Sequence, residues 1–266
     1  MRVTFEPSFE NWRTRARALV QQRVPPEAVV WDDGTASQRS LFEAALPPAE
    51  AAGERRASPT RVPATFVEAA RRVAVHRDAD RWALLYRLLW RLEREGASLL
   101  EDHTDADVRR FEDLRAAVRR DEHKCHAFVR FNAVPDAEAP MGVRYVAWYR
   151  PDHPILTLVA PFFARRFAAM RWSLWTPEAS AHWDGREVRY GAGCDASAAP
   201  SPDAMGELWK TYYASVFNPA RLKLRAMHQE LPRRFLKHLP EAPLVRELVQ
   251  EAPRRLQTFL KAQWRS

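Results

Sequence analysis

The sequence has little cysteine, little lysine and no long apolar run, and each shortage excludes a class of protein. Its two cysteines, Cys125 and Cys194, cannot build a disulfide framework, so we expect a reducing compartment. They are also too few for a radical-type iron–sulfur cluster, which needs three closely spaced thiolates. No stretch approaches the roughly eighteen apolar residues that span a bilayer. The N-terminal string MRVTFEPSFENW lacks the apolar centre of a signal peptide, and we therefore expect a cytoplasmic protein without a membrane partner.

Several standard motifs are also absent from the sequence. It contains no P-loop, no GxGxxG dinucleotide fingerprint, no GxSxG nucleophile elbow and no zinc-finger spacing. We accordingly expect no cofactor, and no reaction class follows from a motif.

What the sequence does contain is arginine. Lys and Arg number 42 against 34 Asp and Glu, which gives a net charge of +8. Only five of the basic residues are lysines. Guanidinium groups match phosphate oxygens and stack on bases, so nucleic acid is the first partner class to consider. Codon bias is the alternative, because the chain is also rich in Ala and Pro, as GC-rich genomes tend to encode.

The spacing of apolar residues changes along the chain and predicts an α+β protein. The expected architecture is a central antiparallel sheet of about four to six strands, with helices before and after it, in a single domain spanning residues 1–266. Within it we expect an N-terminal helix, strand and variable linker (1–62), a helical block (63–121), antiparallel strands (122–192) and C-terminal helices (203–266).

The densest polar stretch, residues 119–131, contains two histidines three residues apart. At helical spacing, His123 and His126 would face one metal ion, with Cys125, His153 or His182 completing the site. The spacing is less regular than in most metal sites, so we assign no metal here.

The same stretch has a second interpretation, as the strand 126–131. His126, Phe128 and Arg130 would then share one face, which suits a phosphate and a base. A structural histidine bound by backbone carbonyls is the third interpretation, and the three remain open at this stage.

A second concentration of polar and aromatic residues contains Trp172, Trp175, His182 and Asp184. His182 and Asp184 would lie on one face at a strand end, where the carboxylate would orient the imidazole as a base. Asp184-Gly185 also predicts a type I′ hairpin turn between residues 181–183 and 186–190, which would use Asp184 structurally.

The strongest basic segment lies near the C-terminus. Residues 220–238 carry six Arg and Lys against one Glu. Asn218 is a good N-cap and Pro219 suits the first helical position, so a helix would begin here with its N–H groups free for a phosphate. A solvated basic face is the alternative. The residues that would bind the DNA backbone are Arg221, Lys223, Arg225, Arg233 and Arg234.

Long strings in the chain resemble a known family. HKCHAFVRF, YVAWYRPDHPIL, PFFARRFAAMRWSLWTP, SAHWDG and LWKTYYASVFNPARLKLRAM are similar to an uncharacterised bacterial family assigned to DNA repair or DNA metabolism. The resemblance implies a domain of unknown function, encoded beside a radical-SAM protein of DNA repair or modification. Some members carry the domain fused to a uracil-DNA-glycosylase-like domain. Members usually have Met at the position of Cys125, and the family supplies no catalytic residues.

Together these observations favour a DNA-binding protein that acts in DNA repair with a radical-SAM partner. Besides the basic segment, a cleft lined by His126, Arg130, Trp172, Trp175 and His182 would receive an unstacked base. Two alternatives stay open. One is an enzyme acting on nucleic acid or a nucleotide, with His123, His126 and His182 as acid and base. The other is a non-catalytic scaffold for the radical-SAM partner.

Overall fold

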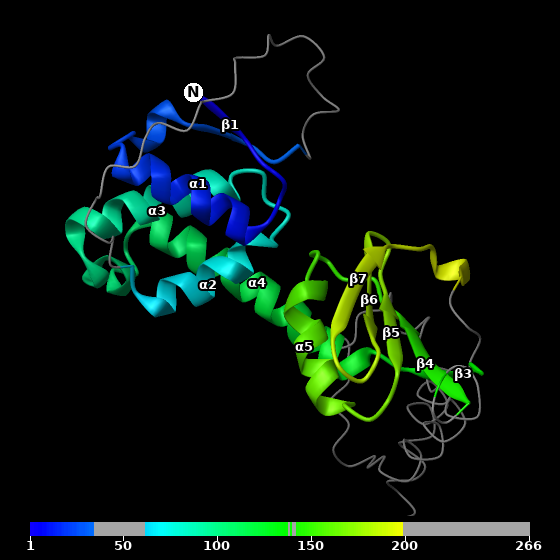
Figure 1. Ribbon diagram of the computed structural model, residues 1–266. Helices are drawn as coiled ribbons and strands as arrows, with labels where there is room; N and C mark the ends of the chain where they lie inside the picture. Colours follow the sequence, from blue (N-terminus) through cyan, green and yellow to red (C-terminus); the bar gives the residue numbers. More distant parts are fainter. Residues whose placement is uncertain (35–61, 138, 140–141, 199–266) are drawn as a thin grey trace, which may run out of the picture. The chain divides into compact units, whose positions relative to one another are not determined.

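The computed structural model describes residues 1–34, 62–137, 139 and 142–198, in two compact units (Figure 1). The first unit comprises Met1–Asp121 together with His153–Ile155. The second comprises Glu122–Asp152 and the chain from Leu156 onward. The expected C-terminal helices at 203–266 and most of the linker before residue 62 lie outside the described residues. None of the described helices is both long and apolar enough to cross a membrane.

The first unit is mostly helical. A short parallel pair, β1 (Arg2–Thr4) and β2 (Val30–Asp32), accompanies the helices. Ser8 caps the first helix, because its Oγ accepts the N–H of Asn11 at 3.2 Å. The helices are α1 (Phe9–Gln21), α2 (Ala64–Ala74), α3 (Arg81–Glu95) and α4 (Ala106–Phe128), with 3₁₀ turns η1 (Pro26–Ala28) and η2 (Ala97–Glu101). The part of α4 from Glu122 onward belongs to the second unit.

The core of the first unit is built on tryptophan. Trp12 of α1 stacks on Trp82 of α3 with 6.2 Å between ring centroids, and Phe5 meets Trp82 edge-on at 5.1 Å. Helix α3 is apolar around most of its circumference, which is typical of a helix packed on several sides. It is therefore the central element of this core.

A buried ion pair anchors the start of α3. The Arg81 guanidinium pairs with the carboxylate of Asp33, which also accepts the indole N–H of Trp82 at 2.8 Å. Arg81 further donates to the carbonyl oxygens of Ala74 at 3.1 Å and Asp78 at 2.9 Å. These bonds connect the end of β2, the end of α2 and the start of α3.

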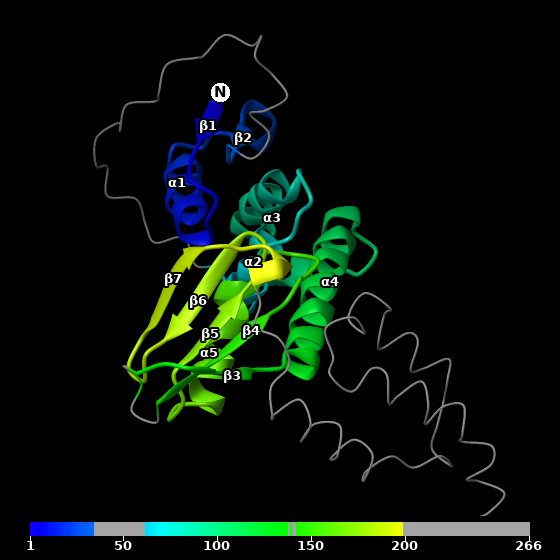
Figure 2. The ribbon, with the colours of Figure 1, turned by 90° about the vertical axis from the view of Figure 1, so that its right-hand side faces the viewer.

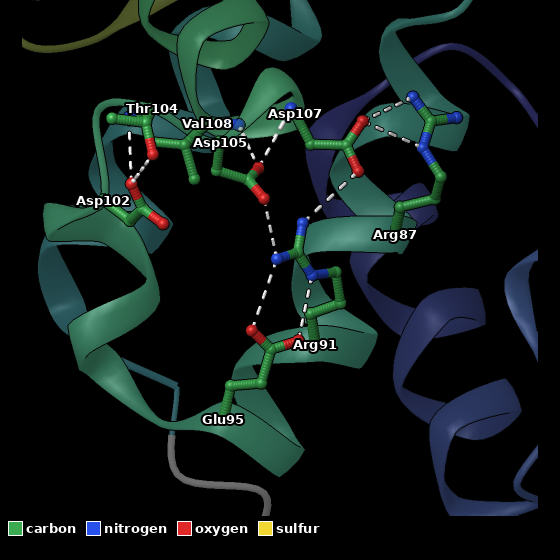
Figure 3. A network of polar contacts seen from close by, with 8 residues as sticks. All are labelled: Arg87, Arg91, Glu95, Asp102, Thr104, Asp105, Asp107 and Val108. Atoms are coloured by element: carbon green, nitrogen blue, oxygen red, sulfur yellow. Dashed lines mark hydrogen bonds and ion pairs between the residues drawn. The ribbon is translucent and has the colours of Figure 1, made fainter.

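A second ionic network joins α3 to the start of α4 (Figure 3). Asp105 is the N-cap of α4, since its Oδ1 accepts the N–H groups of Asp107 and Val108 at 3.0 Å each. Its other oxygen pairs with Arg91 at 2.8 Å, and Arg91 also binds Glu95 at 2.9 Å. The arginines of α3 thus hold the adjoining helix end in place.

Helix α4 corrects one prediction of the sequence analysis. It continues to Phe128, so residues 126–131 do not form a strand, and β3 begins only at Asn132. The buried positions Val118, Cys125 and Val129 keep the helical spacing beyond the expected boundary, and the N–H of Val129 still bonds the carbonyl of Cys125. The alternation of apolar and polar residues in HAFVRF was too short to outweigh that longer period.

The second unit contains a five-stranded sheet in the order β3-β4-β5-β6-β7, seen face-on in Figure 2. The α+β class is therefore confirmed. Strands β4 and β5 are parallel and the other pairs antiparallel, because helix α5 crosses over between those two strands. The elements are β3 (Asn132–Pro135), β4 (Val143–Trp148), α5 (Leu156–Arg166), β5 (Trp172–Trp175), β6 (Ala179–Trp183), β7 (Val188–Ala192) and the 3₁₀ turn η3 (Ala196–Ala198).

The two faces of this sheet differ. Helix α5 packs against one face, where Trp172 meets Phe163 and Phe131 and Trp183 bonds the carbonyl of Ala168 at 3.1 Å. Side chains alternate along a strand, so Ser173 points to the opposite face. The same register places His182 beside Ser173 on that opposite face.

The β6–β7 hairpin forms where Asp184-Gly185 predicted it, but the type I′ turn was wrong. The loop has four residues, because Trp183 pairs with Val188, and among them only Gly185 has a positive φ, of 99°. The Asp184 carboxylate accepts the N–H groups of Arg186 at 2.8 Å and Glu187 at 3.0 Å. These two hydrogen bonds stabilise the four-residue loop. A two-residue turn would not contain both N–H groups.

Candidate functional site

The most organised polar cluster of the second unit is a chain of three side chains on the sheet face opposite α5. His182 lies with Nδ1 at 2.8 Å from Ser173 Oγ and with Nε2 at 2.9 Å from Ser180 Oγ. Strand pairing aligns Ser173 with His182, and Ser180 precedes His182 by two residues, so all three share one face. We call Ser173, Ser180 and His182 the histidine–serine relay.

The relay is shielded from solvent. Ser173 is 5% exposed and Ser180 is 2% exposed. Burial lowers the pKa of His182 below its usual 6.5, and the positive charge of Arg144 on β4 lowers it further. The imidazole is therefore neutral near pH 7, with one N–H to donate and one lone pair to accept a proton.

Gly191 of β7 lies next to the relay. Strand pairing places it opposite Ser180, and a Cβ atom there would lie 3.0 Å from Ser180 Oγ and 3.8 Å from His182 Nε2. Any side chain at this position would press on the Ser180 hydroxyl. Glycine is therefore the residue that fits beside the Nε2 end of the relay.

Asp184 does not orient His182, contrary to one of the predicted arrangements. Its carboxylate accepts the N–H groups of the hairpin loop and lies 3.5 Å from the Arg189 guanidinium. Both ring nitrogens of His182 are engaged by serines instead. Asp184 has the structural role that its place in the turn suggested.

His126 belongs to a different environment. Near the end of α4, its ring packs on Phe162 with 4.0 Å between centroids and meets Phe163 edge-on at 5.7 Å. Its Nε2 is buried without a hydrogen-bond partner, and burial, followed by the nearby His123, lowers its pKa. A histidine packed among phenylalanines in this way is part of the core. The sequence analysis expected a structural histidine to be bound by backbone carbonyls, and no carbonyl binds Nε2.

The predicted cleft lined by both histidines is not formed. Phe163 lies between His126 and Trp172 on the α5 side of the sheet, whereas His182 shares the other face with Ser173. The sheet therefore separates His126 from His182.

The other described residues of that predicted cleft are also dispersed. Trp172 is only 1% exposed, with Phe131 and Phe163 against its ring, so it is not open to stack on a base. Arg130 donates to the carbonyl oxygens of Ala127 at 2.7 Å and Val129 at 3.2 Å, at the C-terminal end of α4. Trp175 is partly buried on the face of the relay.

The residues weighed for a metal site do not form one. Cys125 is fully buried and His123 is exposed on α4. His153 belongs to the first unit, where its ring lies 4.1 Å from that of His76 and its backbone N–H bonds Asp121 at 2.8 Å. Within the part of the chain that the structure describes, no group of three or more His, Cys, Asp or Glu residues could hold a metal ion.

Sequence reasoning missed three residues of the site: Ser173, Ser180 and Gly191. The spacing Ser180-Ala-His182 carried a signal, because residues two apart in a strand share a face. Ser173 and Gly191 come from neighbouring strands, and only the register reveals them.

The predicted phosphate-binding residues lie outside the described residues. These are Arg221, Lys223, Arg225, Arg233 and Arg234. The sequence nevertheless shows where the excess charge is: residues 199–266 contain twelve Lys and Arg against six Asp and Glu. Most of the net charge of +8 therefore belongs to that segment.

Comparison with known proteins relates the chain to a family. The model of a family described as a domain of unknown function, DUF4130, matches residues 79–241, which is more than half of the chain. No curated protein and no solved structure matches the chain. The match spans α3, α4 and the whole sheet, and so includes the histidine–serine relay.

Proposed function

The chain belongs to the DUF4130 family of unknown function, and we propose that it binds DNA and acts in DNA repair together with a radical-SAM protein. The resemblance noted in the sequence supports the biological setting. The distribution of charge supports DNA as the ligand, and it is the observation on which the proposal rests.

Several arginines of the first unit are paired within the protein. Arg81, Arg87 and Arg91 each pair with carboxylates, two of them in the network of Figure 3. Residues 199–266, in contrast, hold twice as many basic as acidic side chains. Such an excess attracts a polyanion, and phosphate groups that bind it release their counterions.

The test is DNA binding by the full chain at two salt concentrations. We expect the affinity for a fluorescent duplex or single strand to fall on the order of a hundredfold or more between 50 and 200 mM salt if about five phosphates are contacted. Fluorescence anisotropy measures this directly. Affinity that is absent, or that does not change with salt, would contradict the proposal.

Two triple variants, each of which removes three positive charges, locate the DNA-binding surface. Arg221→Ala, Lys223→Ala and Arg225→Ala together should weaken binding and reduce the salt slope by about one for each phosphate that the variant no longer binds. The control removes the same charge from α1 with Arg13→Ala, Arg15→Ala and Arg17→Ala, and should change affinity less than about twofold. Equal weakening in both variants would show that net charge, rather than residues 220–238, attracts the DNA.

The radical-SAM partnership has its own test. Co-expression of the two proteins followed by affinity purification should recover both in a fixed ratio. Stable association without any DNA affinity would favour the scaffold alternative instead. Failure to associate, with DNA binding intact, would remove the partner from the proposal.

An enzyme acting on nucleic acid or a nucleotide is the second candidate, and one observation favours it. His182 lies at hydrogen-bonding distance from two serine hydroxyls, as a general base lies beside the group that it deprotonates. His126, packed against Phe162, has no such neighbour at Nε2. Among the candidate histidines, the geometry therefore favours His182.

A further inference from the structure

We infer that Ser180 is a nucleophile toward phosphate esters, with His182 as its general base and Ser173 as the group that orients His182. This goes beyond DNA binding, because it assigns a covalent step to the relay. It rests on the two hydrogen bonds of His182, the close approach of Gly191 to Ser180 and the charge of Arg144.

The order of contacts around His182 resembles that of a nucleophile, base and orienting group. When Nδ1 carries the proton, it donates to Ser173 Oγ, and Nε2 is left to accept the Ser180 hydroxyl proton. A base held by a third group on its far nitrogen is the general arrangement of activated serines. Ser173 takes the place that a carboxylate has in most of them. Because Ser173 has no charge, we expect a slower reaction than a carboxylate would permit.

The Ser180 end of the relay lies beside a glycine on the edge strand. Gly191 lies on the exposed edge strand β7, and its missing Cβ would be 3.0 Å from Ser180 Oγ. Ser173, in contrast, lies on the middle strand β5, between β4 and β6. Ser180 is therefore the serine of the relay that lies nearer the edge of the sheet.

The charge near the relay selects the substrate class. Arg144 on β4 is exposed and close enough to His182 to lower its pKa, and no carboxylate among the described residues pairs with it. Arg189 of β7, which lies opposite His182 in the register, is bound by Asp184 and Glu187. One cation on the face of the relay is thus left to attract a phosphate oxygen.

The reaction has two halves. Ser180 Oγ bonds to phosphorus, the bond from phosphorus to the leaving alcohol breaks, and the serine proton passes through His182 Nε2 to the leaving alkoxide. Water then attacks phosphorus and gives its proton to His182. The Oγ–P bond breaks, and His182 returns the proton to Ser180.

The first experiment uses a tagged fluorophosphonate on the full chain. Ser180 would displace fluoride to form a stable phosphonyl ester, while His182 takes the proton. We expect one label per chain, mapped to Ser180 by peptide mass spectrometry, and no label in Ser180→Ala. No label, or a label on another residue, would overturn the inference.

His182→Gln and Ser173→Ala separate chemistry from folding. We expect His182→Gln to slow labelling about a hundredfold or more and Ser173→Ala to slow it about tenfold. Ser197→Ala, in the exposed turn η3, is the matched control and should label at the wild-type rate. Labelling of folded His182→Gln at the wild-type rate would remove the base from the mechanism.

The pH dependence of wild-type labelling needs no variant to fold. The base must be neutral, so the rate should rise with pH and reach half its maximum below pH 6.5, because burial and Arg144 lower the pKa of His182. Among the described residues of the sheet, the charged groups that share this face with His182 include Arg144, Arg189 and the carboxylates bound to Arg189. A rate that does not change between pH 4.5 and 7.5 would contradict the assignment.

The substrate is tested with bis(4-nitrophenyl) phosphate and with supercoiled plasmid. Release of nitrophenolate without nicking assigns a small phosphate ester, and nicking assigns the DNA backbone. Neither activity would overturn the phosphate-ester class. Labelling by the fluorophosphonate requires no DNA, so its outcome is independent of whether the DNA-binding proposal holds.

Discussion

The two units of the protein use their polar side chains in different ways. In the first unit, carboxylates pair with guanidinium groups, as in Asp33 with Arg81 and Asp105 with Arg91. In the second, His182 is bounded by two uncharged hydroxyl groups. Ion pairs fix the charge of both partners near neutral pH, whereas an imidazole between hydroxyls remains able to exchange a proton.

Function in this chain follows from how each charged side chain is paired. The arginines of the first unit were part of the argument for nucleic acid, yet many of them hold helices together. The second unit has fewer ion pairs among its described residues, but it contains the relay. The number of arginines is therefore a poorer guide to a site than the partners of each one.

The largest expected effect concerns the buried pair of the first unit. Asp33→Ala would leave the Arg81 guanidinium without its carboxylate and the Trp82 N–H without its acceptor. We expect the free energy of unfolding to fall by about 3–5 kcal/mol. Urea denaturation measures it. Glu10→Ala, which breaks exposed pairs with Arg71 and Arg13, is the control and should cost about 0–1 kcal/mol. Equal destabilisation by the two substitutions would show that burial of the pair is not what matters.

The second prediction concerns the pH dependence of stability. The pKa of His126 is lowered in the folded protein, mainly by burial, so the unfolded chain binds more protons as pH falls below about 6.5. Stability should therefore decrease as pH falls from 6.5 toward the folded pKa, by up to about 1.4 kcal/mol per pH unit for this residue.

His126→Phe should remove that share of the slope, because phenylalanine suits the contacts with Phe162 and Phe163 and cannot be protonated. Urea denaturation at pH 5, 6 and 7 measures the slope. The same variant should leave fluorophosphonate labelling unchanged, whereas His182→Gln slows it strongly. An unchanged slope, or an absence of labelling in His126→Phe, would break the distinction between the two faces of the sheet.

The smallest effect concerns the network of Figure 3. Asp105→Ala removes an N-cap and the ion pair with Arg91, and should cost about 1 kcal/mol. Glu95→Ala removes only the exposed pair with Arg91 four residues earlier, and should cost about 0.3–0.5 kcal/mol. Thermal denaturation of both variants tests the order. A larger destabilisation in Glu95→Ala would mean that the helix cap contributes little.

Local pattern predicted much of the fold. The apolar spacing of the region 63–121 corresponds to α2, α3 and most of α4, and Asp184-Gly185 lies in the β6–β7 loop. The end of α4 was misplaced, because six residues of alternation also fit the surface of a helix. The parallel pairing of β4 and β5 depends on the crossover through α5. The residue pattern of neither strand specifies that crossover.

Only one residue of the candidate site, His182, followed from sequence. His182 was proposed from its strand, but Asp184 was the wrong partner for it, because a turn carboxylate finds backbone N–H groups first. Ser173 is nine residues away and meets His182 only through the β5–β6 register. His126 was grouped with His182 although the sheet separates them, since spacing along a chain does not tell which face a neighbouring element covers.

The sequence alone determined the class of the protein: α+β, short of cysteine, and with its excess positive charge near the C-terminus. Composition and local periodicity depend only on the residues and their order along the chain, so they can be obtained without a tertiary structure. Only the tertiary structure decided which polar residues meet. A one-residue change in strand register turns every side chain to the other face, and no local pattern specifies how β5, β6 and β7 align. That alignment places His182 between two serines and leaves His126 among phenylalanines.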